Sequence, residues 1–365
     1  MMTAMKPVLD FVFDANVVFF VAFGLWALTH YALSNSKWRD DYGLQLRLLR
    51  IVFVCVILSP FLSFASVTLS HAIWASAPFT VSDLAVAAYL RGDIAIPAVQ
   101  FEEILNTRSR IFDAVLAGEL PWMTAILAAM AAGSLALFGQ ALWTVLHINK
   151  LVKQSYIWRR TKTTDIRLSD TVSIPFAVRG VFRRHVVLPS DLILNQRELR
   201  VVLAHEFEHL RQGDVEWELF FEFLRPLLYW NPVFVLWKRS FARLRELSCD
   251  RVVLDKLKIS PQEYADCLLN FCLRRSRGYK AERLNVGLVR TRNRGARLAL
   301  EGRLLALQRV QDLNRSTCIF WFAASVLFIG IFLAAASVRD PGDWSHDRLM
   351  LSTVVNLERM EAYGF

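Results

Sequence analysis

Four long apolar segments constrain the fold of this 365-residue chain more than any other feature of its sequence. They run roughly over residues 15–33, 48–73, 122–146 and 318–338. A helix needs about 20 mostly apolar residues to cross a bilayer, and each segment reaches or approaches that length. Because 55% of all residues are hydrophobic, the sequence predicts a mainly α, polytopic membrane protein with four transmembrane helices.

The distribution of charge predicts how these helices are oriented. The loop after the first segment is basic, and residues 148–315 carry 32 Lys and Arg against 18 Asp and Glu. The loop near residues 76–120 holds three basic and six acidic residues. Since basic loops stay in the cytoplasm, we expect residues 148–315 to face the cytoplasm. The 76–120 loop, the N-terminus and the C-terminal tail are expected outside.

This topology predicts four regions along the chain. Residues 1–147 hold three transmembrane helices, 148–315 a cytoplasmic domain, 316–338 the fourth transmembrane helix and 339–365 a short outside tail. The topology, together with contact between basic residues and anionic membrane lipid, accounts for the net charge of +10. No motif interleaves basic and aromatic residues, so direct nucleic-acid binding is not expected.

The cysteines and the N-terminus bear on the compartment. Five scattered cysteines without a CxxC pair argue against a disulfide framework and fit a reducing compartment. The first apolar run follows Lys6, Asp10 and Asp14 and shows no obvious small-residue cleavage site. We therefore expect a retained membrane anchor and not a cleaved signal peptide.

Local signals divide the cytoplasmic region into elements. Residues 173–188 alternate and turn at Arg179-Gly180, which predicts a β-hairpin. Asn195, with Glu198 three residues later, predicts a capping box at the start of a helix. Asn231-Pro232 predicts the start of another helix. Between these helices, residues 215–230 are apolar and aromatic but carry four charges, which favours a membrane-apposed or re-entrant helix over a complete span.

The segment His205-Glu206-Phe207-Glu208-His209 predicts a zinc site. Histidines four residues apart lie on one face of a helix, one turn apart, and can share a metal ion. Glu206 lies beside the first histidine, where it can act as the general base on a water molecule. Glu208 is expected to point elsewhere, into solvent.

The third zinc ligand is less evident from spacing, because catalytic zinc takes three protein ligands. Glu246 lies on the predicted helix after Asn231, with Asp250 one turn later, so Glu246 can bind the metal while Asp250 supports a histidine. Cys249 is an alternative thiolate ligand or a small buried residue. Asp214 either charges a loop or orients a ligand. As a competing interpretation, Glu246 and Asp250 pair only with neighbouring arginines: Arg243, Arg245 and Arg251.

Residues 174–255 resemble the membrane-embedded regulatory zinc metallopeptidases of the BlaR/MecR type, which are gluzincin-like. The resemblance implies that Glu246 is the third zinc ligand and that Asp250 supports the site. It also implies a zincin-like α+β metalloprotease domain between spans 3 and 4, in a bacterial inner (cytoplasmic) membrane, with the predicted hairpin bordering the substrate cleft. The matching pieces are Ile174-Pro175-Phe176, Val187-Leu188-Pro189, the HEFEH segment with Asp214, Trp230-Asn231-Pro232 and Glu246-x-x-Cys249-Asp250.

The chain departs from this family after the fourth span. Members that sense β-lactams carry a penicillin-binding domain there, whereas here residues 339–365 follow without an S-x-x-K motif. We therefore do not expect β-lactam sensing by that route. The tail has apolar residues at amphipathic spacing, and three alternatives stay open: it lies on the membrane, docks on a partner or is disordered. These residues are Leu349, Leu351, Val354, Val355 and Leu357.

Together these features predict an integral-membrane zinc endopeptidase that cleaves a cytoplasmic protein in signal transduction. Its substrate is a transcriptional repressor, another regulator or the chain itself, self-cleavage being implied by the resemblance alone. A partner or ligand on the outside would switch its activity. Two alternatives stay open: an HtpX-like quality-control peptidase, and a non-catalytic membrane receptor or scaffold that uses zinc structurally. The group that stabilises the oxyanion is a tyrosine, an arginine or a backbone N–H.

Overall fold

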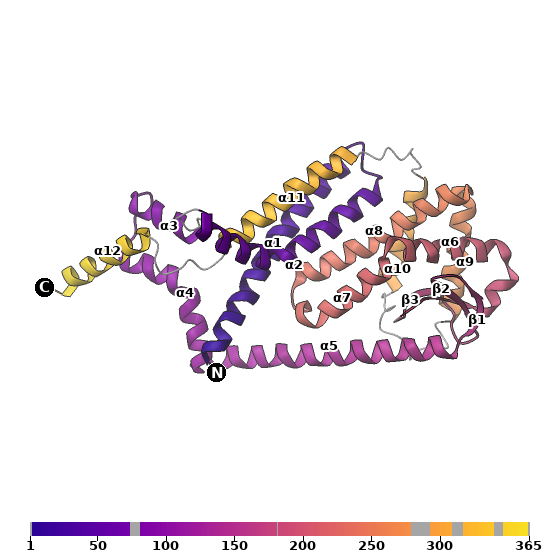
Figure 1. The fold of residues 1–365 in the computed structure, drawn as a ribbon, viewed down its shortest axis with the longest axis horizontal. Coiled ribbons are helices and arrows are strands. Elements are labelled where there is room, and N and C mark those ends of the chain that lie inside the picture. Colours follow the sequence, from indigo (N-terminus) through magenta and orange to yellow (C-terminus); the bar gives the residue numbers. More distant parts are fainter. Residues whose placement is uncertain are drawn as a thin grey trace. The chain divides into compact units, whose positions relative to one another are not determined.

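The computed structural model describes residues 2–73, 81–180, 182–278, 293–308, 317–338 and 346–363. It is mostly helical and contains one small β-sheet (Figure 1). The chain forms two compact units. The first unit comprises residues 1–33, 47–130 and 316–365, and the second comprises residues 34–46 and 131–315.

Four helices are long and apolar enough to cross a membrane, as the sequence predicts. They are α1 (Met2–Ser34), α2 (Tyr42–Ile73), α5 (Pro121–Gln154) and α11 (Thr317–Val338). The apolar lengths within them are Leu9–Ser34, Tyr42–Ser59, Pro121–Gln154 and Thr317–Val338. The more polar stretches between and after these four helices form the remaining helices and the sheet.

Three further helices pack together in the first unit: α3 (Val81–Leu90), α4 (Ala98–Ala117) and α12 (His346–Tyr363). Leu351 and Val355 of α12 are buried in one cluster with residues of α3 and α4. The Arg359 guanidinium lies 2.7 Å from the Glu102 carboxylate. Residues 346–363 of the tail therefore form a helix that packs on α3 and α4 of the same chain, which none of the three alternatives named from the sequence describes. Residues 339–345 lie outside the described residues.

The second unit contains a four-stranded sheet in the order β1-β2-β4-β3. The strands are β1 (Tyr156–Arg160), β2 (Thr164–Ser169), β3 (Phe176–Arg179) and β4 (Arg184–Pro189). Strands β2 and β4 are parallel, and the other two pairs are antiparallel. The predicted hairpin is present as β3–β4, and its turn closes where the Gly180 N–H donates to the Arg183 carbonyl at 2.8 Å. A side chain at Gly180 would lie 2.9 Å from that carbonyl oxygen, which explains the glycine.

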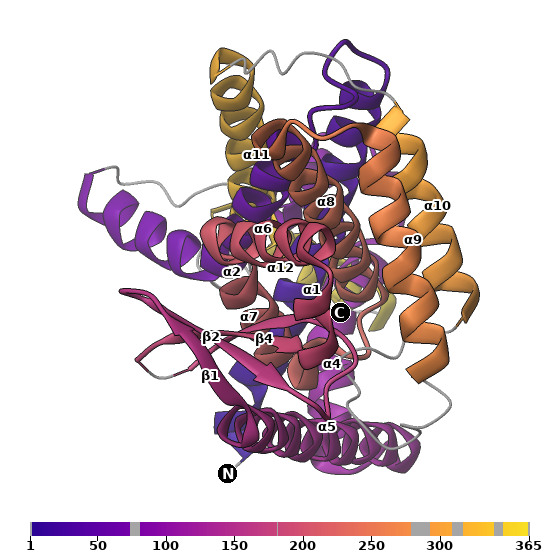
Figure 2. The same cartoon turned by 90° about the vertical axis from the view of Figure 1, so that its right-hand side faces the viewer.

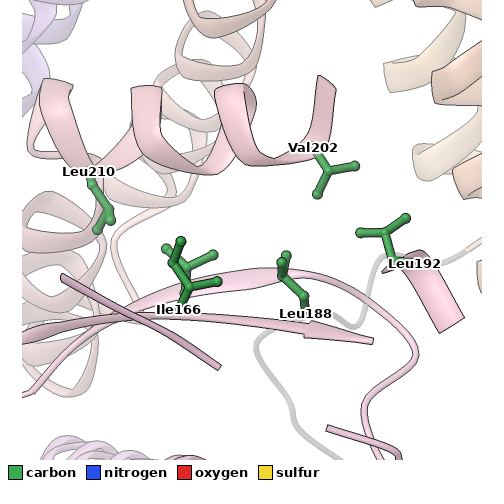
Figure 3. Close-up of a cluster of buried hydrophobic side chains, with 6 residues drawn as sticks. Ile166, Leu188, Leu192, Val202 and Leu210 are labelled. Atoms are coloured by element: carbon green, nitrogen blue, oxygen red, sulfur yellow. The ribbon is translucent and has the colours of Figure 1, made fainter. Parts of the chain in front are cut away.

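Helix α6 (Gln196–Gln212) packs on one face of this sheet and positions the candidate site. Ile166 and Leu188 from the sheet meet Val202 and Leu210 from α6, with Leu192 of the 3₁₀ turn η1 (Ser190–Leu194) between them (Figure 3). The N-cap of α6 is Asn195, whose side-chain oxygen accepts from the Glu198 N–H at 3.3 Å. Only this half of the predicted capping box forms, because the Asn195 N–H donates to the Leu192 carbonyl instead.

Helices α7 (Asp214–Leu228) and α8 (Pro232–Leu257) form an antiparallel pair beside α6, followed by α9 (Pro261–Gly278) and α10 (Asn293–Gln308). The aromatic run in α7 packs on α8, where the rings of Phe221 and Phe241 lie 4.9 Å apart. Leu219, Phe223 and Leu227 on α7 stay exposed. The apolar character of residues 215–230 is thus partly explained by packing within the unit.

Asn231 is the N-cap of α8, and its side chain is expected to stabilise the fold. The buried Asn231 side chain accepts from the Val233 and Phe234 N–H groups at 2.8 and 3.3 Å. Asn231→Ala is expected to lower the free energy of unfolding by about 1–2 kcal/mol, because two buried donors lose their acceptor. Thermal unfolding in detergent measures the loss, and Asn231→Asp, which keeps an acceptor, serves as the control. Equal unfolding temperatures for the wild type and Asn231→Ala would contradict the prediction.

Candidate metal centre

The two histidines of the HEFEH segment lie one turn apart on α6 and meet edge to face. Their Nε2 atoms are 3.1 Å apart, and the ring planes cross at 88°. Two nitrogens bound to one tetrahedral zinc ion at 2.0–2.1 Å lie about 3.3 Å apart. The spacing of His205 and His209 therefore suits a shared ion between their Nε2 atoms.

Glu246 of α8 completes a group of three donors. Its Oε2 lies 3.6 Å from the His205 Nε2, and its Oε1 lies 3.8 Å from the His209 Nε2. Burial alone would raise the pKa of Glu246, but the charge of Arg303, the contact with His205 and the charges of His209 and Arg245 hold it well below its usual value. The carboxylate is therefore ionised and ready to bind a cation. The donor set fits the zinc ligands named from the sequence and the family resemblance.

Cys249 also lies beside His205, and the donor atoms of His205, His209 and Cys249 are all within 4.8 Å of one another. Its sulfur, however, is 3.5 Å from the Nδ1 of His205 and donates to the His205 carbonyl at 3.4 Å. Burial and the nearby charge of Asp250 raise its pKa well above the usual value, which keeps the thiol protonated. The sulfur lies beside the Nδ1 of His205, whereas Glu246 lies beside the Nε2 atoms of both histidines, so the geometry favours Glu246.

Asp214, at the start of α7, holds the second histidine from behind. Its Oδ2 lies 2.7 Å from the His209 Nδ1. Burial lowers the pKa of His209, but the hydrogen bond to Asp214 and the charges of Glu246 and Glu206 outweigh it, and the pKa is raised. Because Asp214 accepts the Nδ1 proton, the neutral ring keeps a free lone pair on Nε2, on the side of Glu246.

The first histidine has a corresponding partner group behind its ring. The His205 Nδ1 lies 3.2 Å from the Tyr264 hydroxyl and 3.4 Å from Asp250 Oδ1. The Tyr264 hydroxyl donates to Asp250 at 2.7 Å, which leaves its oxygen free to accept the Nδ1 proton. The tautomer of His205 is then the same as that of His209, with the Nε2 lone pair directed toward Glu246.

Asp250 is held in turn by Arg303 of α10. The guanidinium donates to both carboxylate oxygens at 2.6 Å and lies 3.1 Å from the Glu246 Oε2. The Arg245 guanidinium lies 3.2 Å from the other Glu246 oxygen. Of the competing arginine pairs, only that of Arg245 with Glu246 forms in the described part of the chain.

Tyr264 and Arg303 were not found from the sequence. They lie 59 and 53 residues beyond the groups that they contact, and one arginine among many gives no local signal. The burial of Asp250 does indicate that such partners exist, because a buried carboxylate requires a cation or hydrogen-bond donors.

Glu206 and Glu208, which flank Phe207, have different surroundings. Glu206 is half-buried, forms no hydrogen bond or ion pair with the described residues, and its charge contributes to the raised pKa of His209. Glu208 is not solvated, contrary to the sequence prediction: its side chain is 1% exposed. It accepts from Arg211 and Gln212 of α6 and from Lys256 of α8 at 2.5–2.7 Å. Burial raises its pKa, but these donors lower it to about 2, so Glu208 joins α6 to α8 as a carboxylate.

Strand β3 is the edge of the sheet that lies beside α6 and α7. Arg179 of β3 and Arg184 of β4 both contact Glu216 of α7 at 2.7 Å. These ion pairs hold the hairpin against α7, which begins at Asp214, and the Arg184 guanidinium also donates to the Leu210 carbonyl of α6 at 3.1 Å. β3 is therefore the edge strand that contacts α6 and α7, the helices that carry His209 and Asp214.

Comparison with known proteins identifies the family of this chain. A protein-family model described as BlaR1 peptidase M56 matches residues 43–299, well over half of the chain. The chain is also 30% identical over 94 residues to the regulatory protein BlaR1 of Bacillus licheniformis. That match covers 25% of this chain and 16% of the length of the relative. The chain therefore belongs to the BlaR1 peptidase family M56.

Proposed function

We propose that this protein is an integral-membrane zinc endopeptidase that cleaves a regulatory protein in the cytoplasm. The observation that carries the proposal is the convergence of three donors. His205, His209 and Glu246 lie 3.1–3.8 Å apart, with both histidine lone pairs on the side of the carboxylate. Two nitrogens and one carboxylate form a ligand set of catalytic zinc, which leaves a fourth position open.

Zinc bound by these residues would lower the pKa of a water molecule and polarise the carbonyl of the scissile peptide. Glu206 would take the proton of the attacking water and pass it to the amine that leaves. Its free, half-buried carboxylate beside His205 suits that role. Asp214, Asp250 and Tyr264 would hold the histidine rings so that their Nε2 atoms stay directed at the ion.

A protein substrate would bind as an extended strand along β3. This strand is an edge of the sheet, and an extended peptide can add to such an edge through main-chain hydrogen bonds. The edge lies beside α6, which carries Glu206. Recognition of main chain within an extended segment favours cleavage inside a protein over removal of single terminal residues.

The orientation is proposed from charge. The second unit contains the whole of the strongly basic 148–315 region, and basic regions remain in the cytoplasm. We place the domain 148–315 there, between spans 3 and 4 of a bacterial inner membrane. The loop 76–120, which packs with α12, then faces outside, where a partner or ligand would regulate the peptidase. A transcriptional repressor is the proposed substrate class.

Glu206→Gln tests the function in cells that express the full chain. We expect turnover to fall about 10²–10⁴-fold, because the variant keeps the metal ligands but loses the base. N-terminal peptides of the proteome are compared between the wild type and the variant. Glu263→Gln, the same change at an exposed carboxylate, serves as the control and should match the wild type.

The outcome also separates the alternatives. A narrow set of cleaved ends lost in Glu206→Gln supports the regulatory peptidase. Loss of many fragments of misfolded membrane proteins would point to an HtpX-like quality-control peptidase instead. No lost end at all, with zinc still bound, would reject proteolysis and leave a receptor or scaffold that uses zinc structurally.

A further inference from the structure

Strand β1 of the second unit is exposed along its whole length. Its five residues, Tyr156 to Arg160, are all exposed, including Tyr156 at 69% and Trp158 at 43%. Large aromatic side chains on an edge strand are unusual in water, because such edges invite association. The strand therefore requires a partner surface.

The position of β1 is set by the end of α5. Arg167 of β2 donates to the Val152 and Ser155 carbonyls at 2.8 and 3.1 Å, which ties the last turn of α5 to the sheet. Figure 2 shows the sheet between α6 and this end of α5. Helix α5 is apolar enough to cross a membrane and ends at Gln154, and β1 begins two residues later. A strand that directly follows a transmembrane helix lies at the bilayer surface.

The charge around β1 has one sign. None of the residues from 120 to 164 is acidic. The basic side chains near β1 are all exposed and form no ion pair within the described part of the chain: Lys150, Lys153, Arg159, Arg160 and Lys162. Basic residues interspersed with tyrosine and tryptophan suit the headgroup region of an anionic leaflet.

Two other occupants fit less well. The substrate edge proposed above is β3, and β1 lies at the opposite end of the sheet order, with β2 and β4 between them. A second copy would bring five further positive charges against the same five, and like charges on facing strands repel. Neither occupant supplies the negative charge that this surface lacks.

We infer that β1 and the residues flanking it bind the anionic phospholipid surface next to the end of α5, and so fix the sheet against the membrane. The aromatic rings enter the headgroup region while the five basic residues contact lipid phosphates. Each basic residue at an anionic surface shifts such an equilibrium about fivefold. This inference requires α5 to cross the membrane but does not depend on the peptidase chemistry.

Photo-crosslinking of the full-length protein in lipid nanodiscs tests the contact. p-Benzoylphenylalanine replaces Trp158 or, as a matched control, Leu194, which is 90% exposed on η1. The nanodiscs contain phosphatidylcholine alone or with about a third phosphatidylglycerol, a composition that supplies the anionic charge. Mass spectrometry measures lipid adducts. We expect adducts at position 158 in the anionic discs and at least fivefold fewer at position 194.

A charge variant provides the second measurement. Arg159→Gln, Arg160→Gln and Lys162→Gln together should lower the adduct yield at position 158 at least fivefold in anionic discs. Equal yields at positions 158 and 194, or adducts to a second copy of the chain, would overturn the inference. If the charge variant unfolds or loses zinc, the comparison of the two probe positions decides alone. If the charge variant keeps its zinc while its adduct yield falls, the fall reflects lost lipid contact and not a failure of the proposed zinc site.

Discussion

Glu246→Ala is expected to remove bound zinc and peptidase activity together, whereas Cys249→Ala is expected to retain both. Wild type should hold about one zinc ion per chain, the occupancy of a single catalytic site. Loss of Glu246 removes the carboxylate whose oxygens lie 3.6 and 3.8 Å from the Nε2 atoms of His205 and His209. It also leaves the guanidinium groups of Arg245 and Arg303, which lie 3.2 and 3.1 Å from that carboxylate, facing the metal position without it.

The loss of zinc affinity should exceed the roughly 10–100-fold effect that follows removal of an outer hydrogen-bonding partner. Elemental analysis of the purified chain measures zinc per protein, and cleavage of a peptide substrate measures turnover. Retention of zinc in Glu246→Ala together with its loss in Cys249→Ala would assign the third ligand to the thiol. Comparison of the two variants therefore decides whether Glu246 or Cys249 is the third ligand beside His205 and His209.

The sequence predicts those parts of the fold that depend on neighbouring residues. The four apolar helices, the N-caps at Asn195 and Asn231 and the β3–β4 hairpin each have a local signal, and the structure contains all of them. Strands β1 and β2 have none. The residues of β1 are all exposed, so no alternation of buried and exposed residues marks the strand. The parallel pairing of β2 with β4 joins residues about 20 positions apart, which no short-range pattern specifies.

The same limit applies to the candidate site. The spacing of His205, Glu206 and His209 follows from one helix, and a family resemblance was needed to favour Glu246. Arg303 reaches the site through the packing of α10 on α8, and Lys256 reaches Glu208 across 48 residues. The prediction for Glu208 was wrong because helical periodicity identifies the face of a residue but not what packs over that face. Arg211 and Gln212, three and four residues further along α6, compensate its burial together with Lys256, and only Lys256 of α8 has no signal in the spacing within α6.

Asp250→Ala is expected to impair both the fold and the metal centre. The variant leaves the half-buried Arg303 without the carboxylate that accepts two of its hydrogen bonds. Removal of one partner from a buried ion pair costs about 3–5 kcal/mol of unfolding free energy, and we expect a loss at the lower end of that range because Glu246 stays 3.1 Å from Arg303. The His205 ring loses a neighbour at 3.4 Å, and Tyr264 loses its acceptor. Zinc affinity should fall about 10–100-fold, as it does when the outer partner of a metal-bound histidine is lost.

A double variant separates these two effects. Asp250→Ala with Arg303→Met removes both charges, so most of the unfolding free energy should return. Zinc affinity should not return, because the Tyr264 hydroxyl, which accepts the His205 Nδ1 proton, still lacks the Asp250 carboxylate that orients it. Thermal unfolding and zinc titration against a competing chelator give the two readouts, with Asp255→Ala, an exposed carboxylate on the same helix, as the control. Recovery of zinc affinity in step with stability would mean that Asp250 acts only on the fold, and Asp250 would then have no direct role in holding His205 toward the ion.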